Sequence, residues 1–447
     1  MTTPSPSAPS TSNVNVVNGN GNDNPSAIKI IIVGAGFAGL TAALELSRKG
    51  FSVLLLEKAS VLSQLGDIIS FGQNSSRFFH NWPGIWDKLS PIIHKAEEVH
   101  YHDWTGKFVT TQSFKEEHAA WGPRVNGHRG EIHKILFDFA KEQENIEILL
   151  GKNIVDYFES EDGESAGVRT DQGEVFTADL VPAAEGVRSR GRKLVLGFED
   201  KPLPSGYAVY RAWYPADKLL ENPITKHLVE NGDSHYAWIG RDVHFLSAAI
   251  HDGKQMSWVC THKDEGDIEE SWTFPGDYRD VVTLLEGWDP VVTELVKATP
   301  EDRLFDYKLV FRDPLPRFVS LPVEGRGGGR TALIGDAAHP FLPTSIQGAS
   351  QAMEDGVVLA ACLDVVRGDK KRVKEAVKVW EKLRYDRVHE VQKTGVQTRE
   401  QWHKADWEAI WKNPESMHLK REQWILDFDA EKDAYERYES VKKELDL

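Results

Sequence analysis

The chain has 447 residues, of which 40% are hydrophobic and 27% charged, as expected for a globular protein with two or three domains. Its formal net charge of −16 argues against a nucleic-acid-binding surface. The two cysteines, Cys260 and Cys362, are far apart, so their spacing predicts neither a disulfide framework nor a zinc site, and we expect no metal.

Residues 1–26 are rich in Ser, Thr, Pro, Asn and Gly and contain almost no apolar block. Such a segment cannot bury enough apolar surface to offset the entropy lost on ordering, so we predict that it is disordered. It lacks the hydrophobic centre of a secretory signal, and no apolar run in the chain reaches the length of a membrane span. With so few cysteines, we expect a reducing compartment and a cytoplasmic protein.

An apolar strand, a glycine turn and the start of a helix follow one another in residues 28–44. Gly34 permits the tight turn after the strand, Gly36 lets a pyrophosphate approach the backbone, and Gly39 lets the helix lie close to the sheet. The next strand ends in Glu57, whose carboxylate can accept hydrogen bonds from a ribose. Together these features predict a dinucleotide site; the alternative is a glycine-bearing βαβ unit without a ligand.

Helical spacing of apolar residues also appears in later parts of the chain, residues 131–143 among them. Residues 75–96 carry aromatic and aliphatic side chains at this spacing, although Pro83 and Gly84 interrupt the pattern. Residues 280–298 and most of the chain after residue 350 are also predicted to be helical.

The middle of the chain predicts a second sheet, because residues 205–262 contain alternating aromatic residues. In the first strand of this region a period of two places Tyr207, Val209, Arg211 and Trp213 on one face. An arginine in so apolar a strand is costly to bury unless it meets an acid, a phenolate or a carbonyl. This strand is therefore a candidate wall of a binding site.

A second strand-to-turn signature occurs in residues 331–340, where the strand leads into Gly335 and Asp336. Asp336 at a strand end can bind a ribityl or ribose hydroxyl. A helix is predicted to begin near Gly348 and Ala349, and its N-terminus can stabilise negative charge on a flavin ring edge or on a phosphate.

The two ordered glycine-containing signatures, some 300 residues apart, resemble the single-component FAD-dependent aromatic monooxygenases, the group of p-hydroxybenzoate hydroxylase and salicylate hydroxylase. The layout is most similar to the fungal members that act on phenols and indole alkaloids. The resemblance spans residue 28 to about residue 365. It implies an α/β fold in which a Rossmann-like FAD-binding domain is interrupted by a mixed or antiparallel substrate-binding sheet and followed by a helical C-terminal extension.

The domain boundaries that follow from this resemblance begin after the N-terminal tail. They are 27–200 for the first part of the FAD-binding domain, 201–304 for the substrate-binding sheet, 305–366 for the second part of the FAD-binding domain, and 367–447 for the extension.

Further site residues are implied by the resemblance. Arg129 corresponds to the FAD-contacting arginine, and Asp67 and Ser70 lie in a segment that resembles the loop beside the flavin. Residues 184–190 resemble the middle motif that is linked to FAD and to the pyridine nucleotide, with Glu185 where the family usually has Asp. A further departure is Ile346, which stands where many members have Gly.

The implied reaction uses bound FAD, NADH or NADPH as a transient co-substrate, and O₂. In this family a flavin C4a-hydroperoxide transfers oxygen to an aromatic carbon, so we expect hydroxylation or epoxidation of an aromatic or indolic molecule in secondary or aromatic-compound metabolism. Our hypothesis is that Arg211 binds or protonates the oxygenated substrate; the alternative is a salt-bridged or edge-exposed arginine. Asp67 is a weaker catalytic candidate that either relays protons or caps a turn. Tyr207, Trp213 and Pro343 are predicted to contact the substrate.

Two other classes of function remain open at this stage. An oxidase or dehydrogenase of the same fold would transfer hydride without inserting oxygen, and a flavin-binding protein without catalytic activity would need only the cofactor site. We expect a monomer or a homodimer, with small molecules as its only other partners.

Overall fold

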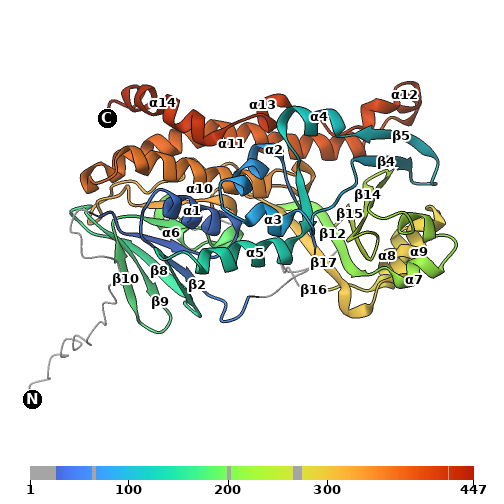
Figure 1. Ribbon diagram of the computed structural model, residues 1–447, viewed down its shortest axis with the longest axis horizontal. Helices are drawn as coiled ribbons and strands as arrows, with labels where there is room; N and C mark the ends of the chain where they lie inside the picture. Colours follow the sequence, from blue (N-terminus) through green and yellow to red (C-terminus); the bar gives the residue numbers. More distant parts are fainter. Residues whose placement is uncertain (1–26, 63–66, 199–202, 265–273, 421) are drawn as a thin grey trace, which may run out of the picture.

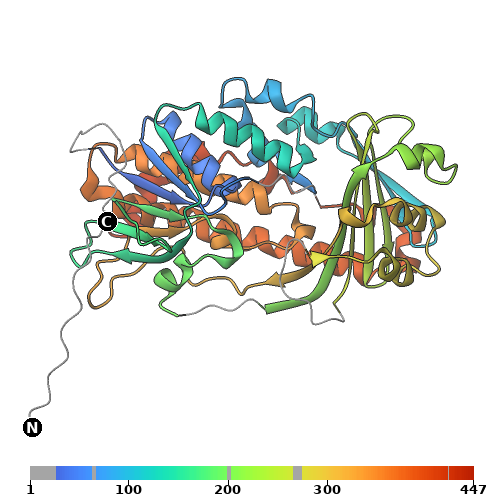
Figure 2. The ribbon, with the colours of Figure 1, turned by 90° about the horizontal axis from the view of Figure 1, so that it is seen from below.

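The computed structural model describes residues 27–62, 67–198, 203–264, 274–420 and 422–447. The tail predicted to be disordered, residues 1–26, lies outside the described residues. Two halves lie at opposite ends of the long axis of the molecule, and the helix α11 (Val373–His403) runs from one to the other (Figures 1 and 2). In the described parts of the chain, no helix combines the length and the apolar character needed to cross a membrane.

The first half is built on a five-stranded parallel sheet with the order β18-β11-β1-β2-β7. Its strands are short apolar runs, and β1, β11 and β18 are buried along their whole length, as expected for a parallel sheet covered on both faces. The strands are β18 (Thr331–Leu333), β11 (Val181–Ala183), β1 (Ile30–Val33), β2 (Val53–Glu57) and β7 (Ile146–Leu150).

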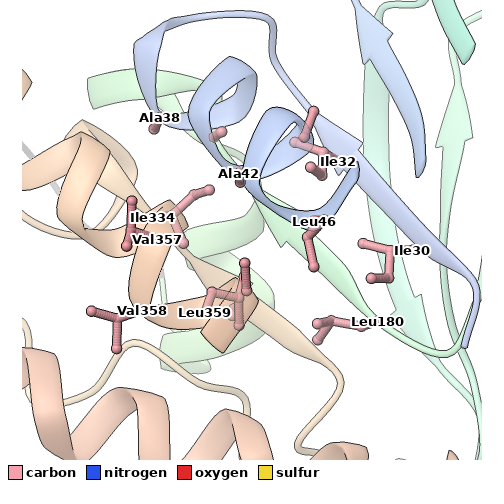
Figure 3. Close-up of a cluster of buried hydrophobic side chains, with 14 of the residues drawn as sticks. Ile30, Ile32, Ala38, Ala42, Leu46, Leu180, Ile334, Val357, Val358 and Leu359 are labelled. Atoms are coloured by element: carbon pink, nitrogen blue, oxygen red, sulfur yellow. The ribbon is translucent and has the colours of Figure 1, made fainter. Parts of the chain in front are cut away.

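The helix α1 (Phe37–Arg48) packs between this sheet and α10 (Gly348–Val365). Figure 3 shows the contact, in which side chains of β1 and α1 meet side chains of α10. Smaller elements complete this half: the strands β3 (Ile68–Phe71), β6 (Val125–His128), β8 (Ile154–Glu159), β9 (Ala166–Thr170) and β10 (Val175–Ala178), and the helices α2 (Gln73–Ser76), α3 (Ile85–Leu89), α4 (Lys115–Trp121), α5 (Arg129–Lys141) and α6 (Gly191–Leu196).

The region 75–96 contains short helical turns, α2 and α3 with a 3-10 turn after α2, and not one continuous helix. The break falls at Pro83 and Gly84, where Gly84 has a φ of +76°. The aromatic side chains Phe78, Phe79 and Trp82 are nevertheless buried in the core of the first half. Pro83 and Gly84 therefore divide the predicted helix into short turns, and its aromatic side chains are still buried in the core.

The second half is an eight-stranded mixed sheet with the order β16-β17-β12-β15-β14-β13-β4-β5. All neighbours are antiparallel except β13 and β4. Its strands are β4 (Glu98–Asp103), β5 (Phe108–Ser113), β12 (Leu203–Pro215), β13 (Ser234–Gly240), β14 (Val243–Ile250), β15 (Gln255–Lys263), β16 (Phe274–Pro275) and β17 (Leu304–Phe311). Because β4, β5 and most of β17 fall outside residues 201–304, the sheet extends beyond the predicted segment.

The two faces of β12 have different neighbours. Tyr210, Ala212 and Tyr214 pack into a core with the helices α7 (Asp217–Glu221), α8 (Tyr278–Leu284) and α9 (Pro290–Ala298). The alternate residues face the first half of the molecule: Val209 lies in a small cluster with Tyr307 and Leu309 on β17. The predicted period of two is confirmed, and the first half covers only one face of the sheet.

The C-terminal region is helical as predicted, with α11, α12 (Trp407–Lys412), α13 (Gln423–Leu426) and α14 (Ala430–Glu444). A buried set of charges joins α11 to α10. Arg384 donates to Asp355 over 2.8 Å and to Glu354 over 2.5 Å, and Arg387 donates to Glu354 over 2.8 Å. Although burial alone would raise the pKa values of these carboxyls, the neighbouring arginines, and His339 beside Asp355, lower them below the ordinary range.

This cluster generates a stability prediction. Replacing Arg384 by Met leaves two buried carboxylates with less compensating charge, and breaking a buried ion pair costs about 3–5 kcal/mol. We expect Arg384→Met to lower the denaturant midpoint strongly. The matched control is Lys382→Met on the same helix, whose ion pairs with Glu444 and Asp386 are partly exposed and contribute about 0–1 kcal/mol. Equal midpoints in urea titrations of the two variants would contradict the prediction.

Candidate active site

The carboxyl ends of the five parallel strands meet at one cavity of about 740 Å³. Strand order reverses around β1, with β2 on one side and β11 on the other, and this is where open α/β sheets bind their ligands. Seven of the predicted cofactor residues line the cavity: Gly34, Gly36, Glu57, Arg129, Asp336, Gly348 and Ala349. The glycine turn after β1 and the Gly335–Asp336 turn, which are distant in sequence, therefore line the same cavity.

Two of the three glycines of the first turn have contrasting surroundings. A Cβ built on Gly39 would lie 1.9 Å from the carbonyl oxygen of Gly34, so the close helix packing excludes any side chain there. A Cβ on Gly36 would meet no atom within 4 Å. The space beside Gly36 is therefore open toward the cavity, as the approach of a pyrophosphate requires.

Glu57 is held in place by the backbone around it. Its Oε2 accepts a hydrogen bond from the N–H of Ala35 over 2.8 Å, and its Oε1 accepts one from the N–H of Ala59 over 2.9 Å. The carboxylate is thereby fixed beside the glycine turn, at the end of β2, where a ribose-binding acid is expected.

Several cavity residues were not singled out as cofactor-binding from the sequence. Lys152 and Asn153 line the cavity directly after β7, and Lys58 directly follows Glu57. Because β7 is the parallel neighbour of β2, residues just beyond its carboxyl end had to reach the same edge of the sheet. Arg129 and Lys58 give the cavity cationic side chains suited to a pyrophosphate, and Lys152 is ion-paired with Glu174 over 2.6 Å.

Asp336 lies in a 3-10 turn, η5 (Gly335–Ala337), after β18. Burial raises the pKa of its carboxyl, and the charges of His339, Arg129 and Arg192 act in the opposite direction. The turn is itself anchored, because Asp355 accepts a hydrogen bond from the N–H of Gly335 over 2.8 Å. The position of Asp336 thus depends on a carboxylate of α10.

Glu185, which replaces the usual Asp, lines the same cavity but bonds to protein groups. Its Oε2 accepts hydrogen bonds from the hydroxyls of Tyr157 over 2.6 Å and Ser189 over 2.8 Å. Burial raises the pKa of Glu185, while these hydrogen bonds act to lower it. The additional methylene of Glu places the carboxylate within reach of Tyr157 on β8, so this residue fixes the loop after β11.

The two predicted catalytic residues form an ion pair across the junction of the two halves. Arg211 on β12 donates to the carboxylate of Asp67, which immediately precedes β3. The Arg211 side chain is only 5% exposed, and its guanidinium also lies over the ring of Phe305. The backbone carbonyl of Asp67 accepts a hydrogen bond from the N–H of Arg129 over 2.9 Å. The pair is thereby connected directly to the wall of the cavity.

The remaining predicted residues lie outside the cavity lining. Gly39 packs beneath it, and Ser70 pairs with Asn126 between β3 and β6. Trp213 is buried edge-on against the ring of His128. Pro343 begins a 3-10 turn, η6 (Pro343–Ser345), that packs on α11, and the half-buried Tyr207 lies against His403 of the same helix.

Fold and site together define an FAD-binding protein of the Rossmann-like type: the open glycine turn, the fixed ribose acid and the cationic walls fit this dinucleotide. A family model described as an FAD binding domain matches residues 27–300. Asperlicin C monooxygenase of Petromyces alliaceus is 32% identical, with 93% of this chain and 89% of that protein covered. The FAD-dependent monooxygenase okaB of Penicillium ochrochloron is 34% identical, with 92% and 90% covered.

Solved structures agree with these relatives. The crystal structure of CtdE in complex with FAD and a substrate has a TM-score of 0.85 and 32% identity, with 94% of this chain and all of that chain covered. A salicylate hydroxylase substrate complex, at 23% identity and with 92% and 98% covered, has a TM-score of 0.75 and shares the fold. The chain belongs to the family of FAD-dependent monooxygenases. It is an oxidoreductase with FAD as cofactor, and NADH or NADPH is the usual co-substrate of the family.

Substitutions of Gly36 and Gly39 are expected to have different effects, one on FAD content and the other on the stability of the apoprotein. Gly36→Val places a side chain in open space, so we expect FAD content to fall at least about tenfold, a loss of roughly 1.4 kcal/mol, while the stability of the apoprotein is unchanged. Gly39→Ala, the matched control, creates a backbone clash and is expected to destabilise the apoprotein by about 1–3 kcal/mol. Flavin absorbance and urea unfolding of the apoproteins measure both. Normal FAD content in Gly36→Val would contradict this assignment.

Proposed function

We propose that this monooxygenase uses NAD(P)H and O₂ to hydroxylate or epoxidise an aromatic or indolic small molecule at the junction of its two halves. The observation that carries the proposal is the Arg211–Asp67 pair, because it joins the sheet to a segment hydrogen-bonded to the FAD cavity wall. The expectation of a cytoplasmic monomer or homodimer belongs to the same proposal.

The sheet supplies an apolar surface beside this pair. Val209, Tyr307 and Leu309 form a cluster on the face of β12 and β17 that looks toward the first half, and Tyr207 and Val259 lie half-buried against it. Aromatic side chains on such a face offer edge and stacking contacts to an aromatic ring, and an apolar wall excludes water. This surface therefore favours an aromatic substrate over a highly polar one.

FAD, when bound, supplies the redox chemistry with O₂, and the protein's residues orient the substrate and manage charge. Arg211 is permanently cationic and can donate two parallel hydrogen bonds, so it can hold a phenolate or carbonyl oxygen of the substrate and stabilise negative charge that develops there. Asp67 holds the guanidinium in position, and its Oδ1 is buried without a hydrogen-bond donor among the described residues.

The direct test of oxygen insertion uses the FAD-loaded protein with NADH or NADPH, a panel of phenols and indoles, and isotopically heavy O₂. We expect one panel member to accelerate NAD(P)H oxidation and to yield a product that carries the heavy isotope. Substrate oxidation with unlabelled product and stoichiometric hydrogen peroxide would instead identify an oxidase. Failure of all reagents to reduce the flavin would leave a cofactor-binding protein without this activity.

Arg211 is tested separately by Arg211→Met combined with Asp67→Asn, since the single variant would leave a carboxylate without its partner. Loss of the guanidinium charge that stabilises negative charge on the substrate predicts coupled turnover at least about 100-fold lower, with unchanged FAD content. The control is Arg279→Met on α8, whose side chain is 75% exposed and ion-paired with Asp277. Near-wild-type coupled turnover in the double variant would overturn the catalytic role of Arg211.

A further inference from the structure

One face of α11 crosses from the FAD-binding half to the sheet. Gly395 packs under η6, since a Cβ there would lie 3.0 Å from Cβ of Ser345, and its carbonyl accepts a hydrogen bond from Thr344 over 2.6 Å. Eight residues later, Nε2 of His403 lies 2.7 Å from Nδ1 of His244 on β14. Arg399 is four residues from each of Gly395 and His403, so it lies on the same helix face, halfway along the rise of about 12 Å between them. Arg399 therefore lies between the turn η6 and the sheet.

The surroundings of Arg399 are those of a binding group. Its guanidinium carbon lies 5.0 Å from the centre of the Tyr207 ring, which also packs against His403, with ring centres 4.9 Å apart. The Arg399 side chain is 15% exposed. One terminal nitrogen donates to Glu400 over 3.1 Å, whereas Nε is buried and has no hydrogen-bond acceptor within the described ranges. A guanidinium offers five N–H donors, so capacity remains for a ligand.

The distance between the two arginines defines the length of that ligand. Tyr207, which Arg399 covers, and Arg211 share one face of β12, and four residues of a strand span about 13 Å. Val209 lies between them in the apolar cluster with Tyr307. A molecule on this surface would meet a cation at each end and aromatic side chains in the middle.

Building on the proposed function, we propose that Arg399 is a specificity-determining residue that binds an acceptor oxygen, a carboxylate or an amide carbonyl, at the end of the substrate remote from Arg211. The substrate class is then an aromatic or indolic ring carrying such a group on an extension several bonds long. Arg399 comes from the C-terminal extension, which thereby forms one wall of the substrate compartment in addition to its packing role.

The test measures binding to the FAD-loaded protein, without turnover, by equilibrium dialysis. The probes are indole-3-butyrate, indole-3-butyramide and 3-butylindole, which differ only in the terminal group. We expect wild-type protein to bind at least one oxygen-bearing probe about tenfold or more tightly than 3-butylindole, and Arg399→Gln to reduce this preference to within about twofold at unchanged FAD content. Tighter binding of the butyrate identifies an anionic group, and tighter or equal binding of the butyramide identifies a neutral carbonyl.

Lys393→Gln is the matched control, because Lys393 lies on the same helix, is 61% exposed and pairs with Glu390. Arg399→Lys keeps a positive charge but loses the planar guanidinium, so we expect a binding preference between those of wild type and Arg399→Gln. If Arg399→Gln fails to load FAD, Arg399→Lys serves as the test variant. Unchanged preference in the Arg399 variants, or no discrimination or no binding by wild-type protein, would overturn the inference. Oxygen insertion is measured in a separate experiment. If the protein inserts oxygen but the Arg399 variants keep the wild-type binding preference, the inference on Arg399 is wrong and the proposed function still holds.

Discussion

The structure depends on one buried carboxylate, that of Asp355 in α10. Its Oδ2 accepts a hydrogen bond from the N–H of Gly335 and lies 2.6 Å from the imidazole of His339, while its Oδ1 accepts one from Arg384. One side chain thus fixes the turn that carries Asp336 and docks α11 against α10. A charge buried in this way is tolerated only when its partners are all in place, so the geometry of the cofactor site and the attachment of the C-terminal extension are coupled.

The cofactor cavity follows from the direction of the strands. Five parallel strands place five loops at one edge, and the reversal of strand order around β1 opens a crevice between them. The sheet of the second half instead presents one face to α8 and α9 and the other to the FAD-binding half. The Arg211–Asp67 ion pair connects the two halves, because Arg211 lies on the sheet of the second half and Asp67 in the first half. The carbonyl of Asp67 also accepts a hydrogen bond from the N–H of Arg129 in the cavity wall.

The sequence predicted the parts of the fold that rest on local patterns. The β1-turn-α1 unit, the acid at the end of β2 and the alternation along β12 each follow from spacing within a few residues, and the structure has all three. Lys152 was not chosen, because its position at the cavity depends on β7 being the neighbour of β2, which is a pairing between distant segments. Likewise, the membership of β4 and β5 in the second sheet could not be read from local periodicity.

The long helix α11 also limits how the molecule can move. Its 31 residues extend about 46 Å, with Arg384 buried against α10 in its first half and Trp402 and His403 buried against the sheet at its end. A hinge opening of the two halves would have to bend this rod or detach one of its ends. A polypeptide that ended before α11 would therefore lack the rod that holds the two halves at a fixed separation.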